Sequence, residues 1–119
     1  MFLDSEQLDG GWGNHKLLYV GMVYGRPLRG RILEHMRGDD AWNWIERNRK
    51  GEVTAKVANV TPGEGRNLSE QLVRDIENLL IFKLNPPANL QGIMTYTGRP
   101  IRIINGRRSS PIPPELTFS

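Results

Sequence analysis

The chain has 119 residues, 38% of them hydrophobic and 24% charged, which suits one domain with a single hydrophobic core. No apolar run reaches the length of a transmembrane helix, and the acidic N-terminus lacks the pattern of a secretory signal. The absence of cysteine excludes disulfide bonds and cysteine-ligated zinc. We therefore expect a cytoplasmic protein with no membrane contact, and the sequence leaves its oligomeric state open.

The net charge of +3 conceals an uneven distribution of basic residues. Residues 16–50 contain eight bases and four acids, and the chain from residue 98 onward contains four arginines and one acid. Twelve of the sixteen basic residues are arginine, whose planar guanidinium binds phosphate with paired donors. Two interpretations stay open, a phosphate-rich partner or a small basic protein whose charges only keep it in solution.

The first half of the chain predicts strands and then helices. Residues 15–24 ("HKLLYVGMVY") are rich in Leu, Val and Tyr and predict a strand, with a short strand before it at residues 1–4. Residues 26–38 place apolar side chains four apart and predict a helix. Residues 39–51 begin with acids and end with bases, which favours a second helix.

The second half predicts a strand, a long helix and a further β element. Residues 52–60 ("EVTAKVANV") alternate as a half-buried strand does. Residues 67–84 predict a helix, in which Asn67 and Glu70 have the spacing of a capping box. Residues 93–108 predict a hairpin or an edge strand. Together the elements indicate a small α/β domain with helices covering a short sheet.

Five polar residues stand out on this framework. Tyr19 follows two leucines near the end of the "LLYVG" run, and Arg31 and His35 are four residues apart on one helix face. Glu77 lies within the apolar run "IENLLIFKL", where a buried carboxylate is costly without a partner, and Asn89 follows a pair of prolines. Each residue alone has an ordinary structural explanation, but the set in this order suggests a site.

The segments "LLYVG", "RILEH" and "IENLLIFKLNPPAN" resemble, in order, the motifs of the GIY-YIG nuclease family. The last segment matches the family pattern E-x-x-L-I-x-K-x-x-P-x-x-N and is the most specific of the three. No tyrosine precedes Tyr19, so the tyrosine of the family's first motif has no counterpart, and we expect "MFLD" to be the remainder of the first strand. Arg29 is an alternative to Arg31 for the helix arginine.

The resemblance implies a GIY-YIG-like domain over residues 1–92, with a short, mainly antiparallel three-stranded sheet flanked by helices. Residues 93–119 would be a C-terminal extension that is basic and then proline-rich.

The resemblance also implies a metal-dependent DNA endonuclease. Glu77 would bind Mg²⁺ or Mn²⁺, Arg31 a phosphate oxygen, and Tyr19 would act as base or position the water. His35 would tune Tyr19, and Asn89 would brace the helix that carries Glu77. The alternative is a catalytically inert DNA-binding or protein-interaction module on the same fold.

Contact with the DNA duplex is expected from the densest basic region of the chain. It comprises Arg26, Arg29, Arg37, Arg47, Arg49 and Lys50. A second basic arm comprises Arg99, Arg102, Arg107 and Arg108. Such contacts make binding salt-sensitive and largely independent of sequence. The other interpretation is that these side chains only solvate two helices and a tail.

Overall fold

The computed structural model describes residues 2–6, 15–37, 40–49, 52–56, 59–63, 65–90, 92, 94–106 and 112–118. In chain order the elements are β1 (Phe2–Glu6), β2 (His15–Val20), α1 (Leu28–Met36), α2 (Asp40–Asn48), β3 (Val53–Lys56), α3 (Glu70–Leu84), β4 (Ile101–Ile104) and β5 (Glu115–Phe118). None of the helices in this part of the chain is long and apolar enough to span a membrane.

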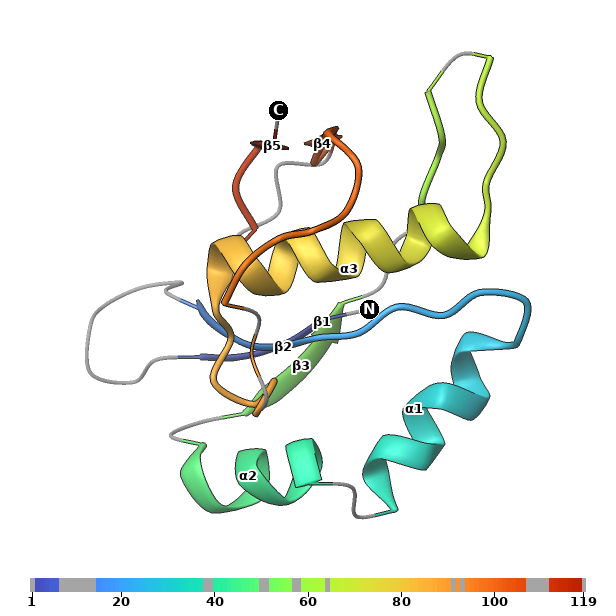
Figure 1. Cartoon of the computed structure of the whole chain (residues 1–119). Coiled ribbons are helices and arrows are strands. Elements are labelled where there is room, and N and C mark those ends of the chain that lie inside the picture. The colour runs from blue at the N-terminus through green and yellow to red at the C-terminus, as the bar shows by residue number, and fades with distance from the viewer. Residues whose placement is uncertain are drawn as a thin grey trace.

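The first three strands form one antiparallel sheet in the order β2-β1-β3. Helices α1 and α2 lie against one face of this sheet, and α3 lies on the other side (Figure 1). The expected mixture of helices with a short antiparallel sheet is confirmed, and β1 is the short strand predicted at the N-terminus. The strand predicted over residues 15–24 is shorter and ends at Val20.

Two clusters of buried side chains fill the two sides of the sheet. The first, which we call the α1–α2 core, contains Leu18, Tyr19, Ile45 and Ala88. The second, the α3 core, contains Val20, Leu80 and Ile81. Strand β2 contributes to both, so the residues at its end are fixed from two sides.

Helix α3 begins and ends at caps that the sequence only partly predicts. Its N-cap is Ser69, whose Oγ accepts a hydrogen bond of 3.1 Å from the backbone N–H of Leu72. The capping box predicted from Asn67 is therefore wrong, because Ser69 lies directly before the first helical residue and satisfies its N-terminal donor. At the other end Asn85 adopts a left-handed conformation with φ of 46° and donates to the carbonyl oxygen of Ile81, 2.9 Å away.

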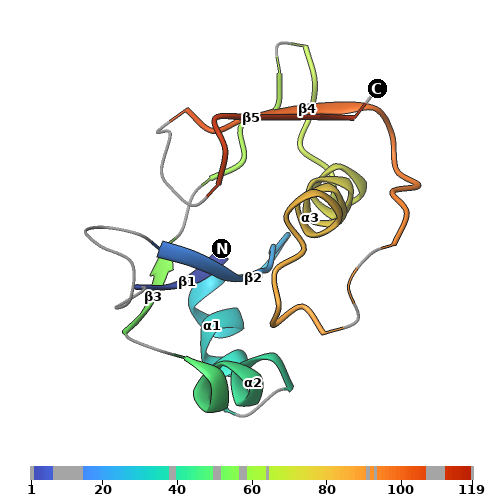
Figure 2. The same cartoon turned by 90° about the vertical axis from the view of Figure 1, so that its left-hand side faces the viewer.

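The C-terminal residues form a two-stranded sheet rather than a loose tail. A strand is present within the predicted range 93–108, but its partner is β5 in the proline-rich end, where no strand was expected. This hairpin of β4 and β5 lies across α3 on the side away from the first sheet (Figure 2). Side chains of Ile103, Ile112 and Leu116 pack against the α3 core. The layers are thus hairpin, α3, sheet, and α1 with α2.

Candidate active site

A β-bulge near the end of β2 determines on which face of the sheet its last side chains lie. The register between β1 and β2 shifts between Leu3 and Asp4, which leaves Leu18 as an extra residue on β2. A bulge breaks the alternation of side chains between the two faces. Leu18 and Tyr19 consequently both pack into the α1–α2 core, whereas Val20 packs into the α3 core.

Gly21 leaves the space that the ring of Tyr19 occupies. A Cβ atom on Gly21 would lie 2.7 Å from Cε1 of Tyr19 and 3.0 Å from its hydroxyl oxygen. Tyr19 is only 7% exposed, so the ring has little room to move aside. The Tyr-x-Gly spacing therefore has a physical reason, since the glycine allows the Tyr19 hydroxyl to lie at the end of β2.

We expect Gly21→Ala to lower the free energy of unfolding by about 1–3 kcal/mol, because the new methyl group displaces a buried ring. Chemical denaturation measures this change. Gly63→Ala is the matched control, because nothing lies within 4 Å of a Cβ atom there. Equal stabilities of the two variants would show that Gly21 does not position Tyr19.

Asn89 binds the backbone of β2 through both ends of its amide. Its Nδ2 donates to the carbonyl oxygen of Val20 and its Oδ1 accepts from the N–H of Val20, each at 2.9 Å. The N–H of Ala88 donates to the carbonyl oxygen of Leu18 at 2.8 Å. The loop after α3 thus covers the outer edge of β2, and Asn89 joins that loop to the strand end that carries Tyr19.

Glu77 lies half-buried on α3. Helical spacing places it one turn before Leu80 and Ile81, which pack against Val20. Within the described part of the chain, no three His, Asp or Glu side chains gather as a metal site. Glu77 stays a candidate single-carboxylate anchor, on the helix whose Leu80 and Ile81 pack in the α3 core.

Arg31 and His35 both lie on α1, as expected from their spacing. Their side chains lie outside the part of the chain that the structure describes. Arg29, the alternative to Arg31, is exposed on the same helix. The structure therefore joins Tyr19 and Asn89 at one strand end, whereas the convergence of α1 with them stays a prediction.

The predicted basic region divides into paired and unpaired arginines. Arg26 forms an ion pair with Glu34, which offsets its charge. Arg29, Arg37 and Arg49 are exposed and make no ion pair with a residue that the structure describes. Lys50, Arg107 and Arg108 lie outside the described residues.

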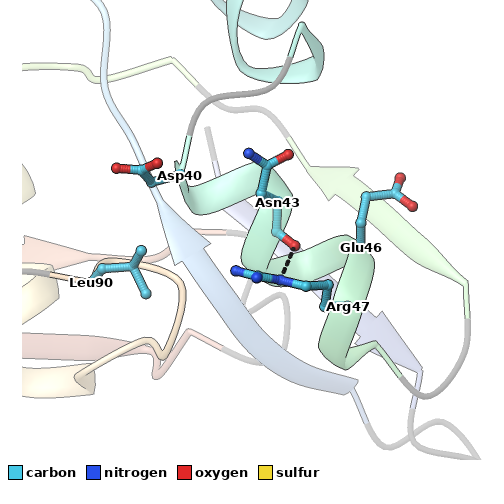
Figure 3. A pocket seen from close by; sticks show the side chains of 5 residues that line it. All are labelled: Asp40, Asn43, Glu46, Arg47 and Leu90. Atoms are coloured by element: carbon cyan, nitrogen blue, oxygen red, sulfur yellow. Dashed lines mark hydrogen bonds between the residues drawn. The ribbon is translucent and has the colours of Figure 1, made fainter.

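Arg47 lies in an open groove of about 450 Å³ between α2 and the loop after α3. Asp40, Asn43 and Glu46 line the groove from α2, and Leu90 lines it from the loop (Figure 3). The Nε of Arg47 donates to the backbone oxygen of Asn43 at 3.3 Å, and the guanidinium points into the space facing Leu90. Two acids beside one arginine leave this groove without a net positive charge.

Asp75 is a buried carboxylate that the sequence reasoning missed. Two hydrogen bonds to the carboxylate offset the cost of its burial. They come from Nε of Arg99 at 3.0 Å and from Nε2 of Gln71 at 2.8 Å. Burial alone would raise the pKa of Asp75, but these hydrogen bonds together lower it below the usual range. The signal was present in the sequence, since Asp75 lies three residues after Leu72 and four before Leu79, on one apolar face of the helix.

The lowered pKa of Asp75 predicts a loss of stability in acid. An unfolded aspartate titrates near ~3.9 and the folded one lower, so the ionised carboxylate stabilises the fold above about pH 4. This contribution disappears as the pH falls through the lower, folded pKa. Urea denaturation between about pH 5 and pH 2 should therefore show a steeper decline for the natural chain than for Asp75→Asn. Parallel declines would contradict the assignment.

A scan against protein-family models finds no match for this chain, and searches of curated proteins and of solved structures return none either.

Proposed function

We propose that the chain is a metal-dependent DNA endonuclease on a GIY-YIG-like fold. The observation that carries the proposal is the meeting of two distant segments, residues 19–21 and residues 80–89, at Val20. Gly21 makes room for Tyr19 beside it, Asn89 binds its backbone, and Leu80 and Ile81 pack against its side chain. These segments are those that resemble the second motif of the family and its Glu-to-Asn motif.

The topology supports the same proposal. The resemblance requires a tyrosine at the end of an antiparallel hairpin and the glutamate on a later helix, and both requirements are met by β1–β2 and by α3. Gly21 leaves room for the ring of Tyr19, and the amide of Asn89 pairs with the backbone of Val20, the residue between them. A chance resemblance between unrelated loops would not require an asparagine amide to pair with the strand that carries the tyrosine.

The donor chemistry at Glu77 fits a hard divalent cation. Mg²⁺ prefers oxygen ligands and retains several waters, so one carboxylate on a rigid helix is a sufficient protein anchor when substrate phosphate completes the shell. When bound, such a cation would neutralise charge that develops on the phosphate and stabilise the leaving oxygen.

The protein side chains have separate roles in this proposal. The Tyr19 hydroxyl positions or deprotonates the attacking water; as its ordinary pKa is ~10, a nearby cation or donor must favour the phenolate. Arg31, or Arg29 in its place, binds a non-bridging phosphate oxygen with paired donors. His35 is one turn from Arg31 and tunes the proton on Tyr19. Asn89 holds the strand end in place and does not contact the substrate.

A second function, a DNA-binding module without catalysis, is favoured by one specific observation. Residues 1–18 contain no tyrosine, so they supply no counterpart of the tyrosine in the family's first motif. Binding through exposed arginines such as Arg29, Arg37 and Arg49 would persist without it.

Cleavage and binding assays separate these functions. Supercoiled plasmid and branched DNA should be cut by the purified chain in Mg²⁺ or Mn²⁺, and not in excess EDTA. Salt-sensitive binding without any cleavage would replace the nuclease by the binding module. Absence of both activities would contradict both functions.

A further inference from the structure

The segment before β4 wraps tightly around the carboxylate of Asp75. Tyr96 is buried, and its hydroxyl donates to the backbone oxygen of Arg99. A Cβ atom on Gly98 would lie 2.5 Å from that hydroxyl oxygen and 2.7 Å from Oδ1 of Asp75. The ring of Phe118 packs edge-on against Tyr96 with 4.6 Å between centroids. Arg99 is therefore presented by a backbone that is fixed on several sides.

The ion pair of Asp75 and Arg99 is asymmetric in its exposure. The Asp75 side chain is 2% exposed, whereas the Arg99 side chain is 58% exposed. The hydrogen bond uses Nε of Arg99, so the donors on the two terminal nitrogens of the guanidinium take no part in it. The negative charge thus lies beneath the positive one, and an anion approaching from solvent meets the guanidinium first.

The other described arginine pairs are arranged differently. Arg102 donates through both Nε and Nη2 to the two carboxylate oxygens of Glu115, at 2.6 Å and 3.3 Å. Glu115 is itself 48% exposed, so its carboxylate would repel an approaching phosphate. The pairs Arg26–Glu34 and Arg74–Glu70 likewise have both partners exposed. Asp75 and Arg99 are thus the pair in which burial hides the acid but not the base.

We propose that Arg99 is a preoriented phosphate-binding residue for the DNA backbone, with Asp75 as the positioning residue that fixes its guanidinium. This inference rests on the proposed function, because it assigns a contact between the DNA backbone and the protein surface on the hairpin side of α3. A guanidinium held by an ion pair loses less conformational entropy on binding than the exposed side chains of Arg29 or Arg37, which form no ion pair with a described residue. Burial of Asp75 then serves binding as well as stability.

Salt-dependent DNA binding tests this role. Fluorescence anisotropy with a labelled duplex gives the apparent affinity of the full chain at several salt concentrations. We expect Arg99→Gln, whose amide can still donate to Asp75, to weaken binding about three- to tenfold and to reduce the slope of log K against log salt by about 0.9. The matched control Arg74→Gln removes the same charge from an exposed ion pair on α3 and should leave the slope unchanged.

The outcomes distinguish a failure of the role given to Arg99 from a failure of the proposed function. If the natural chain binds and the two glutamine variants have equal slopes, whether both reduced or both unchanged, the inference is wrong while the proposed function stands. If the natural chain does not bind DNA, the proposed function itself fails. Thermal unfolding verifies that the variants are folded. If Arg99→Gln does not fold, Arg99→Lys replaces it, and we expect this variant to bind DNA more weakly with the salt dependence of the natural chain. A folded Arg99→Lys variant with a smaller salt dependence would show that Arg99 does not bind the DNA backbone.

Discussion

Replacement of Glu77 by alanine should reduce metal-dependent DNA cleavage by about 10²–10³-fold or more, which is the scale on which loss of a transition-state charge contact acts. Glu77 is half-buried on a helix that packs against β2, so its carboxylate is held where a mobile surface glutamate would not be. DNA binding should change little, since the exposed arginines are untouched. The rate of plasmid nicking at saturating Mg²⁺ measures the effect.

The control for this variant is Glu70→Gln on the same helix. Glu70 forms an exposed ion pair with Arg74 in the first turn, so its loss removes a carboxylate of little energetic importance. Cleavage should be unchanged in this variant. If Glu77→Ala cleaves as fast as the natural chain, the metal is anchored elsewhere and the role given to Glu77 is wrong.

Deletion of residues 93–119 should abolish cooperative folding of the remaining domain. The deletion uncovers the α3 core, which Ile103, Ile112 and Leu116 cover, and removes Arg99 from the buried carboxylate of Asp75. Three half-buried aliphatic side chains contribute about 3–5 kcal/mol together, and the loss of the hydrogen bonds from Arg99 that lower the pKa of Asp75 adds to this. The sum approaches the total stability of a small domain. Far-ultraviolet circular dichroism with urea denaturation detects the loss.

Two point substitutions test whether side-chain packing, and not the length of the chain, accounts for the loss of stability. Ile104 lies on the outer face of β4 and is exposed, so Ile104→Ser should leave the denaturation midpoint nearly unchanged. Leu116→Ala on the inner face should lower stability by about 2 kcal/mol. A chain of residues 1–92 that unfolds with the midpoint of the full chain would show that the hairpin is an independent appendage.

Much of the architecture can be predicted because local patterns carry it. The apolar spacing of α3 and the proline pair after Leu84 define that helix, and the alternation around Val53 indicates β3. The order of these elements predicts helices that cover a short sheet, whereas its antiparallel pairing was expected only from the family resemblance. The ends of the helices are harder to predict than the helices themselves. At the start of α3 both Asn67 and Ser69 have side chains suited to an N-cap, and the local backbone conformation determines which of them caps the helix.

The remaining features that the sequence did not predict depend on contacts between distant residues. The bulge at Leu18 depends on pairing with β1, and the partner of β4 lies in a proline-rich segment with little strand propensity. The buried pair of Asp75 and Arg99 joins residues 24 positions apart. Within the candidate site, the amide of Asn89 finds the backbone of Val20 only once the chain has folded, and the sequence could suggest a bracing role but not its partner.

The most direct measurement is the position of a divalent ion in crystals grown with Mn²⁺ and a short DNA duplex. Anomalous diffraction locates manganese without reference to the protein coordinates. The nuclease proposal predicts a peak about 2.0–2.5 Å from a carboxylate oxygen of Glu77, with a DNA phosphate on its other side and the Tyr19 hydroxyl facing the same phosphate. A crystal with DNA bound but manganese absent from Glu77, while the same protein cleaves DNA in solution, would contradict it.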